Sequence, residues 1–264
     1  MRVQNAMPDR KIYLLVPTRP VPTHDKLPGL RRLVESVQNT ADSKNVQLCF
    51  GVDERPEDRA HLEFCQSVPG AFIRHETDTC SGHWKHLSLR CPERPDDVLM
   101  LCADDVWFPF QGWDEKVLQH AAKPRHELYF CDDGFGWRST FATHPFLRFD
   151  TAQRIGGLAT GLWSRANDTW LWCLWHLFDP SRVIYMQDVK IKHQYVRENT
   201  HQVNGHRADM ATFRERGADE MTWRVKALRE AAGITTPPVD GFCRDYMKFT
   251  RSGDRYEIEI LGNR

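Results

Sequence analysis

Apolar positions in the first half of the chain form two alternating patterns, short continuous runs and runs spaced as on one face of a helix. Continuous apolar runs are typical of strands that are buried on both faces of a sheet. We expect strands within KIYLLVPTRP (11–20), VQLCFGVDE (46–54), AFIRHE (71–76), DVLMLCADD (97–105) and ELYFCDD (127–133). Helical spacing predicts helices between them, at 27–39, 57–66, 83–91 and 113–123.

This alternation predicts an α/β fold, because strands joined through helices pair in parallel and carry helices on both faces of the sheet. The second half has a different pattern. It predicts a turn and short helix at 141–158, a helix at 167–178, a strand pair or bent strand at 182–195, one or two helices at 208–233 and a hairpin within 239–263. We therefore expect one domain over 1–200, with a C-terminal helical and hairpin extension over 201–264 packed on the same domain.

Polar residues gather where the expected strands end. The clusters are Pro17-Thr18-Arg19, Asp53-Glu54, Asp104-Asp105 and Asp132-Asp133. Any one of them alone is typical of a solvated turn. In a parallel sheet, however, ligands bind beyond the carboxyl ends of the strands. Because these clusters all fall at that edge, they predict a binding site for a charged ligand.

Composition and missing signatures exclude several classes of protein. Lys+Arg and Asp+Glu both number 36, so the net charge is zero and we expect weak non-specific binding to polyanions. No apolar run approaches the ~20 residues that cross a bilayer, and MRVQNAMPDRK (1–11) lacks the apolar middle of a signal peptide. We expect a cytoplasmic protein with no membrane partner.

The eight cysteines form no C-x-x-C pair, which predicts reduced thiols and not a zinc knuckle. The dinucleotide, P-loop and nucleophile-elbow signatures G-x-G-x-x-G, G-x-x-x-x-G-K-[ST] and G-x-S-x-G are also missing. These absences disfavour a nicotinamide enzyme, a P-loop enzyme and an α/β-hydrolase.

Short motifs follow one another in a defined order over roughly 11–200. They are Pro17-Thr18-Arg19, Val52-Asp53, Ala103-Asp104-Asp105 with Trp107-Phe108, Gly112-Trp113-Asp114, His144-Pro145-Phe146, Ile155-Gly156-Gly157, Asn167-Asp168 and Lys192-His193. Each motif is weak alone. In this order the chain resembles the GT-A class of nucleotide-sugar glycosyltransferases, in the broad family-2-like group, and among these the compact phage-type members.

The resemblance implies a GT-A (Rossmann-like), mostly parallel sheet, a divalent cation (Mn²⁺ or Mg²⁺) and a nucleotide-sugar donor, with a UDP-sugar favoured. The implied metal ligands are Asp104, Asp105 beside it, and His193. The implied nucleotide and donor contacts are Pro17, Thr18, Arg19, Asp53, Trp84, Lys85 and Ala103. The chemistry agrees, because a metal held by strand-tip carboxylates neutralises the charge that grows on a diphosphate leaving group.

The resemblance also implies that Asp168 is the catalytic base that takes a proton from the acceptor hydroxyl. A structural alternative is that Asp168 only favours a helix N-terminus through the macrodipole. Two positions depart from the family pattern. Cys102 stands where the first acid of D-x-D is usual, and Asn167 replaces a glutamate. Whether transfer inverts or retains configuration stays open.

Several functions remain as hypotheses. The first is glycosyl transfer to a hydroxyl acceptor, which the phage-type resemblance suggests is a hydroxymethylated pyrimidine in phage DNA. A saccharide acceptor is the alternative. A metal-dependent nucleotidyltransferase or phosphohydrolase would use the same strand-tip acids, but normally with two metals and a denser set of carboxylates. A non-catalytic nucleic-acid or sugar-binding module is a further hypothesis.

Overall fold

The computed structural model describes residues 10–18, 26–134, 142–160, 167–193, 216, 218–234, 247–252 and 255–260. The strands are β1 (Ile12–Thr18), β2 (Val46–Val52), β3 (Phe72–His75), β4 (Val98–Leu101), β5 (Val106–Trp107), β6 (Leu128–Asp132), β7 (Phe146–Arg148), β8 (Val183–Lys190), β9 (Lys192–His193), β10 (Met247–Ser252) and β11 (Arg255–Ile260). The helices are α1 (Leu27–Thr40), α2 (Arg59–Ser67), α3 (Cys80–Arg90), α4 (Trp113–His120), α5 (Phe149–Arg154), α6 (Asn167–Phe178) and α8 (Ala218–Ala231). Short 3-10 turns lie at Pro56–Asp58 and Pro180–Arg182.

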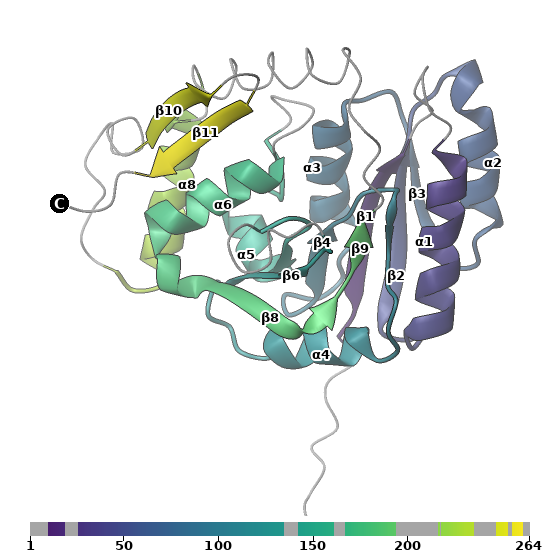
Figure 1. Ribbon diagram of the computed structural model, residues 1–264, viewed down its shortest axis with the longest axis horizontal. Helices are drawn as coiled ribbons and strands as arrows, with labels where there is room; N and C mark the ends of the chain where they lie inside the picture. Colours follow the sequence, from purple (N-terminus) through teal and green to yellow (C-terminus); the bar gives the residue numbers. More distant parts are fainter. Residues whose placement is uncertain are drawn as a thin grey trace, which may run out of the picture.

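Within the described residues, a seven-stranded sheet in the order β3-β2-β1-β4-β7-β6-β8 forms the centre of the molecule (Figure 1). Neighbouring strands are parallel except where β7 pairs with β4 and with β6. The mostly parallel sheet that the sequence predicts is therefore confirmed. Because β1, β2, β4 and β6 all run in one direction, their carboxyl ends share one edge, which we call the rim.

Each face of the sheet has its own apolar core, because side chains alternate along a strand. Ile12, Leu14 and Val16 of β1 point to the face that α1, α2 and α4 cover. Tyr13 and Leu15 point to the face that α3, α5, α6 and α8 cover. Figure 1 shows α1 and α2 on one side of the sheet and α5, α6 and α8 on the other. The expectation of helices on both faces is also confirmed.

Strand β7 is the main departure from the sequence prediction. We expected a turn and a short helix over 141–158, and the helix is present as α5, but Phe146–Arg148 is a strand between β4 and β6. It has three residues and runs antiparallel to both neighbours. So short a segment shows no period in the sequence. Its pairing with β4 and β6 is what makes it a strand.

The described C-terminal elements agree in type with the prediction of a helix and a hairpin. Met221, Val225 and Leu228 of α8 are fully buried in the core that α6 lines. Strands β10 and β11 pair antiparallel, with Ser252 opposite Arg255. The remaining residues of 201–264 lie outside the described ranges, and a boundary at 200 stays a prediction.

The sequence predicts reduced thiols and no membrane-spanning segment. The described cysteines are all free, and each except Cys80 is buried. Helices in the described ranges are all too short or too polar to cross a bilayer.

Replacing Phe146 by alanine tests the packing of β7. The side chain is fully buried in the middle of the sheet, so Phe146→Ala should lower the free energy of unfolding by about 3–5 kcal/mol. Phe72→Ala on β3 is the matched control, because Phe72 is 41% exposed and its loss should cost less than about 0.5 kcal/mol. Urea unfolding measures both. Equal costs for the two variants would contradict the central position of β7.

Candidate functional site at the carboxyl edge of the sheet

The turn after β4 places Asp104 at the rim, beside the end of β1 and the start of α1. Its side chain is 2% exposed. Lys26 Nζ donates to Oδ1 over 2.8 Å, and Thr18 Oγ1 donates to Oδ2 over 3.0 Å. Burial and the adjacent charge of Asp105 raise the pKa of Asp104, while Lys26 and Thr18 oppose that rise. Both oxygens of Asp104 are therefore already engaged within the protein.

Helix α1 begins directly against this turn. At Gly29, in the first turn of the helix, an added Cβ would lie 3.1 Å from the carbonyl oxygen of Asp104 and 3.4 Å from Asp105 Cα. Lys26 precedes the helix, and its side chain is 28% exposed. Burial alone would lower the pKa of Lys26, but Asp104 and Asp105 raise it above its usual value. A charged lysine is thus held close to both carboxylates.

A second pair at the rim joins the first half of the chain to the second. Strand β5 pairs with β9 so that Val106 lies opposite His193, and the His193 amide donates to the Asp133 carbonyl over 3.2 Å. This pairing places His193 Nε2 3.1 Å from Asp105 Oδ1. Burial alone would lower the pKa of His193 and raise that of Asp105, but their mutual contact reverses both shifts.

His144 packs edge-on against His193, with the ring centroids 4.8 Å apart. Burial and the charge of His193 lower the pKa of His144 to about 4. Its backbone has φ of 47°, a left-handed conformation that is uncommon for residues other than glycine. His144 is therefore neutral near pH 7 and adds no positive charge beside the Asp105–His193 pair.

The Asp105–His193 pair fits a divalent metal better than Asp104 does. Neighbouring ligands on an octahedral ion with bonds of about 2.1 Å are about 3 Å apart, close to the 3.1 Å between Asp105 Oδ1 and His193 Nε2. Within the described ranges, no three His, Cys, Asp or Glu side chains are grouped to hold a metal by themselves. The remaining ligands would have to come from substrate and water, as is usual for Mg²⁺ at phosphate sites. For Asp104, metal ligation stays a prediction, and its bonds to Lys26 and Thr18 weigh against it.

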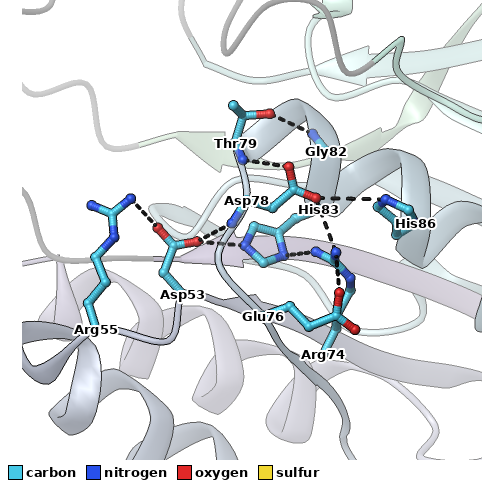
Figure 2. A network of polar contacts seen from close by, with 9 residues as sticks. All are labelled: Asp53, Arg55, Arg74, Glu76, Asp78, Thr79, Gly82, His83 and His86. Carbon is cyan, nitrogen blue, oxygen red and sulfur yellow. Dashed lines mark hydrogen bonds and ion pairs between the residues drawn. The ribbon is translucent and has the colours of Figure 1, made fainter.

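A second polar network lies at the rim after β2 (Figure 2). Asp53 is 2% exposed, and its Oδ1 lies 2.9 Å from His83 Nε2 and accepts from the Asp78 amide over 3.1 Å. Arg55 reaches Oδ2 at 3.1 Å. Burial alone would raise the pKa of Asp53, but these partners lower it. The network holds Asp53 ionised and in one orientation.

The contacts of His83 fix its tautomer. Arg74 Nη1 lies 2.8 Å from His83 Nδ1, and a guanidinium only donates, so Nδ1 must accept. The proton is therefore on Nε2, which donates to Asp53. Burial is the largest cause that lowers the pKa of His83, and the charge of Arg74 lowers it too. Gly51 permits this arrangement, because an added Cβ would lie 2.5 Å from the imidazole.

The other residues that the sequence implied lie near the same edge with different environments. Pro17 is the next-to-last residue of β1, and Ala103 lies in the turn after β4. Trp84 Nε1 donates to the carbonyls of Leu15 and Cys102, so this indole ties α3 to the strand ends. Lys85 lies against the Gly157 turn, where an added Cβ would meet its Cγ at 3.4 Å. Arg19 lies outside the described ranges.

Asp168 stands in the first turn of α6, where its Oδ1 accepts from the Thr169 amide over 2.8 Å. Ser81 Oγ donates to the side chain of Asn167 over 2.9 Å, which ties the start of α6 to α3. The charge of Asp168 also raises the pKa of His193, so the two groups act on each other electrostatically. The structure therefore places Asp168 at the start of α6, and its role as the catalytic base stays a prediction.

Sequence reasoning missed Lys26, His83 and Arg74. A histidine in the first turns of a helix and a lysine just before a helix are common on protein surfaces, so neither is a signal by itself. Arg74 also gave no signal of its own, because it follows two apolar residues and precedes a histidine in a short strand. The contacts that bring them into the site join residues 9 to 78 positions apart along the chain.

No protein-family model matches the sequence, and no curated protein is similar to it in sequence. Solved structures are similar in three dimensions. The mannosyltransferase PcManGT from Pyrobaculum calidifontis, in complex with GDP-Man and Mn²⁺, has a TM-score of 0.53 at 12% identity, over 89% of this chain and 79% of that one. S. aureus TarS 1-349 has a TM-score of 0.51 at 12% identity, over 95% and 96%, and a complex of it with UDP has a TM-score of 0.50. At this identity the likeness shows the fold alone, which is the GT-A glycosyltransferase fold.

Protonation of His83 should weaken the fold at mildly acidic pH. The pKa of His83 is lowered in the native protein, so the unfolded chain takes up this proton first as the pH falls below about 6.5. His83→Gln, which keeps a side-chain donor for Asp53, should therefore lose less stability than the wild type between pH 7 and pH 5. Other histidines with lowered pKa contribute equally to both proteins, so the difference between the two unfolding curves is the informative quantity. Parallel curves would contradict the lowered pKa of His83 in the native protein.

Proposed function

We propose that this protein is a metal-dependent glycosyltransferase that moves a sugar from a nucleotide-sugar donor to a hydroxyl acceptor. The observation that carries the proposal is the Asp105–His193 pair, 3.1 Å apart at the rim of a GT-A sheet. The PcManGT complex with GDP-Man and Mn²⁺ and the TarS complex with UDP support it, since both proteins share this fold.

The metal would be held by Asp105 and His193. When bound, it supplies positive charge for the diphosphate leaving group. Of the two cations considered, Mn²⁺ suits the pair better, because Mg²⁺ prefers oxygen ligands alone. Asp53, held ionised at the end of β2, would accept hydrogen bonds from the base or ribose. Thr18, Pro17 and Ala103 lie at the adjacent strand ends and would contact the donor. Trp84 and Lys85 of α3 are further proposed donor contacts, and so, from the sequence resemblance alone, is Arg19.

Asp168 would take the proton from the acceptor hydroxyl as the oxygen attacks the anomeric carbon of the donor sugar. In that step the glycosidic C–O bond to the diphosphate breaks, and the diphosphate leaves with the bonding electrons. The match of Asn167-Asp168 to the acidic pair of the resembled family supports this role, as does the effect of the Asp168 charge on the pKa of His193. The bond from the Thr169 amide fixes the carboxylate.

For the donor we propose a UDP-sugar, and TarS with UDP is the supporting comparison. For the acceptor, a hydroxymethylated pyrimidine in phage DNA rests on the sequence resemblance alone. Arg224 does not support contact with phosphates, because it is 3% exposed, pairs with Glu220 and stacks on Trp170 and Trp223. Trp170 is fully buried, so it packs in the core and does not stack a nucleobase. A saccharide hydroxyl is the alternative acceptor.

Ligand-dependent thermal stability tests the donor site. UDP with Mn²⁺ should raise the unfolding midpoint, since a ligand at a hundred times its dissociation constant adds about 2.7 kcal/mol to stability. Asp105→Asn should abolish the shift, because it removes a metal ligand without changing the shape of the side chain. Asp42→Asn, in the exposed turn between α1 and β2 at the opposite edge of the sheet, should leave the shift intact. GDP and ADP with Mn²⁺ test the choice of nucleotide.

Failure of every nucleoside diphosphate to shift the midpoint with Mn²⁺ present would count against a transferase. Release of inorganic phosphate or of a nucleoside monophosphate without sugar transfer would instead favour a phosphohydrolase or nucleotidyltransferase.

Replacing the proposed base tests the catalytic step. Asp168→Asn should lower kcat by about 10²–10⁴-fold, because the amide cannot accept the hydroxyl proton. Binding of UDP with Mn²⁺ should be unchanged. The measurement is donor turnover with hydroxymethylated DNA and with oligosaccharides as acceptors. A kcat near that of the wild type would leave Asp168 only its position at the end of α6.

A further inference from the structure

Lys26 is a charged side chain at the rim that the proposed function does not use. Its ammonium lies 2.8 Å from Asp104 Oδ1, and it also acts on the charge of Asp105. We propose that Lys26 is a second cation of the donor site, whose ammonium uses its remaining N–H donors to bind the diphosphate while it keeps its contact with Asp104. Asp104 is then the positioning residue that holds Lys26 in the free protein. This inference rests on the proposed function.

The burial of Asp104 explains why a cation has to be there before the ligand arrives. A carboxylate that is 2% exposed needs a partner, because removing an unpaired charge from water costs several kcal/mol. Thr18 supplies one hydrogen bond, and Lys26 supplies the opposite charge. The close approach at Gly29 keeps the start of α1 against the turn that carries Asp104 and Asp105. Lys26 is therefore held beside the proposed metal pair without being sealed off, since its side chain keeps 28% exposure.

The balance of charge at the rim is the reason why Lys26 would strengthen the binding of a diphosphate. Asp104 and Asp105 carry two negative charges, so a divalent metal alone would bring the pair only to neutrality. The ammonium of Lys26 adds one further positive charge beside the metal. A diphosphate would then be attracted both to the metal and to Lys26, whose ammonium has three N–H donors and can bond a phosphate oxygen and Asp104 at the same time.

A Lys26 that binds the diphosphate should affect the two ligands, Mn²⁺ and UDP, in opposite directions, unlike an ion pair that only supports the fold. Its positive charge lies close to the places of both, and it repels the metal and attracts the diphosphate. Its removal should therefore strengthen binding of Mn²⁺ alone and weaken binding of UDP at saturating Mn²⁺. A residue that only supports the fold would weaken both or change neither.

The test compares Lys26→Gln with Lys26→Arg, which keeps the charge, and with Lys11→Gln, which removes the same charge at the opposite end of β1. Calorimetry or electron paramagnetic resonance gives the affinity for Mn²⁺ without nucleotide. Calorimetry at saturating Mn²⁺ gives the affinity for UDP and, as a probe without phosphates, for uridine. For Lys26→Gln we expect Mn²⁺ to bind about tenfold tighter and UDP about tenfold weaker, the size of one close charge interaction in a protein. Uridine should bind as to the wild type, and both control variants should keep wild-type affinities.

The double variant Lys26→Gln/Asp104→Asn covers the case in which the single variant does not fold, because it leaves no unpaired buried charge. Its reference is Asp104→Asn alone, because these two variants differ only at Lys26. The double variant should bind UDP about tenfold more weakly than Asp104→Asn does, with uridine unaffected, since the lost contact is to phosphate. UDP affinity of Lys26→Gln equal to that of the wild type, or of the double variant equal to that of Asp104→Asn, would overturn the role of Lys26 while the proposed function stands. A wild-type protein that binds neither Mn²⁺ nor UDP would overturn the proposed function, and this inference with it.

Discussion

The buried carboxylate of Asp104 is the constraint around which the rim is arranged. It can remain ionised at 2% exposure only because β1 brings Thr18 to one oxygen and the start of α1 brings Lys26 to the other. The three residues come from three separate elements, so their contacts fix how β1, β4 and α1 meet. Gly29 belongs to the same arrangement, since any side chain there would push α1 away from the turn.

The neighbouring residue Asp105 faces a different part of the protein. Its partner His193 arrives from the second half of the chain through the short pairing of β5 with β9. Adjacent carboxylates at one strand end therefore have different environments, one neutralised internally by a lysine and one beside an imidazole. Two like charges so close would raise each other's pKa, and the division of partners is what lets Asp105 keep a lowered pKa.

At the end of β2, Asp53 is held by a separate hydrogen-bond network that includes His83 and Arg74. Arg74 only donates, so it selects the His83 tautomer that donates to Asp53. The close contact of His83 with Gly51 anchors this ring on β2. Asp53, Asp104 and Asp105 thus owe their orientation to cations or donors from other elements, such as His83 of α3, Lys26 before α1 and His193 of β9, while the strands that precede the acids supply only their positions.

The sequence by itself determined the alternation of strands and helices in the first half and the edge at which the acids gather. Continuous apolar runs such as those at 46–54 and 97–105 and helical spacing such as that at 27–39 reflect local periodicity, which the chain carries without help from distant contacts. The acids Asp53, Asp104 and Asp105 were found for the same reason, because they follow apolar runs, whereas the resemblance to GT-A glycosyltransferases implied His193. Tertiary structure decided what periodicity cannot encode. Three residues of β7 became a strand because β4 and β6 offered unpaired edges, and the partners of the acids were chosen by contacts such as Lys26 with Asp104 across 78 residues and His83 with Asp53 across 30 residues.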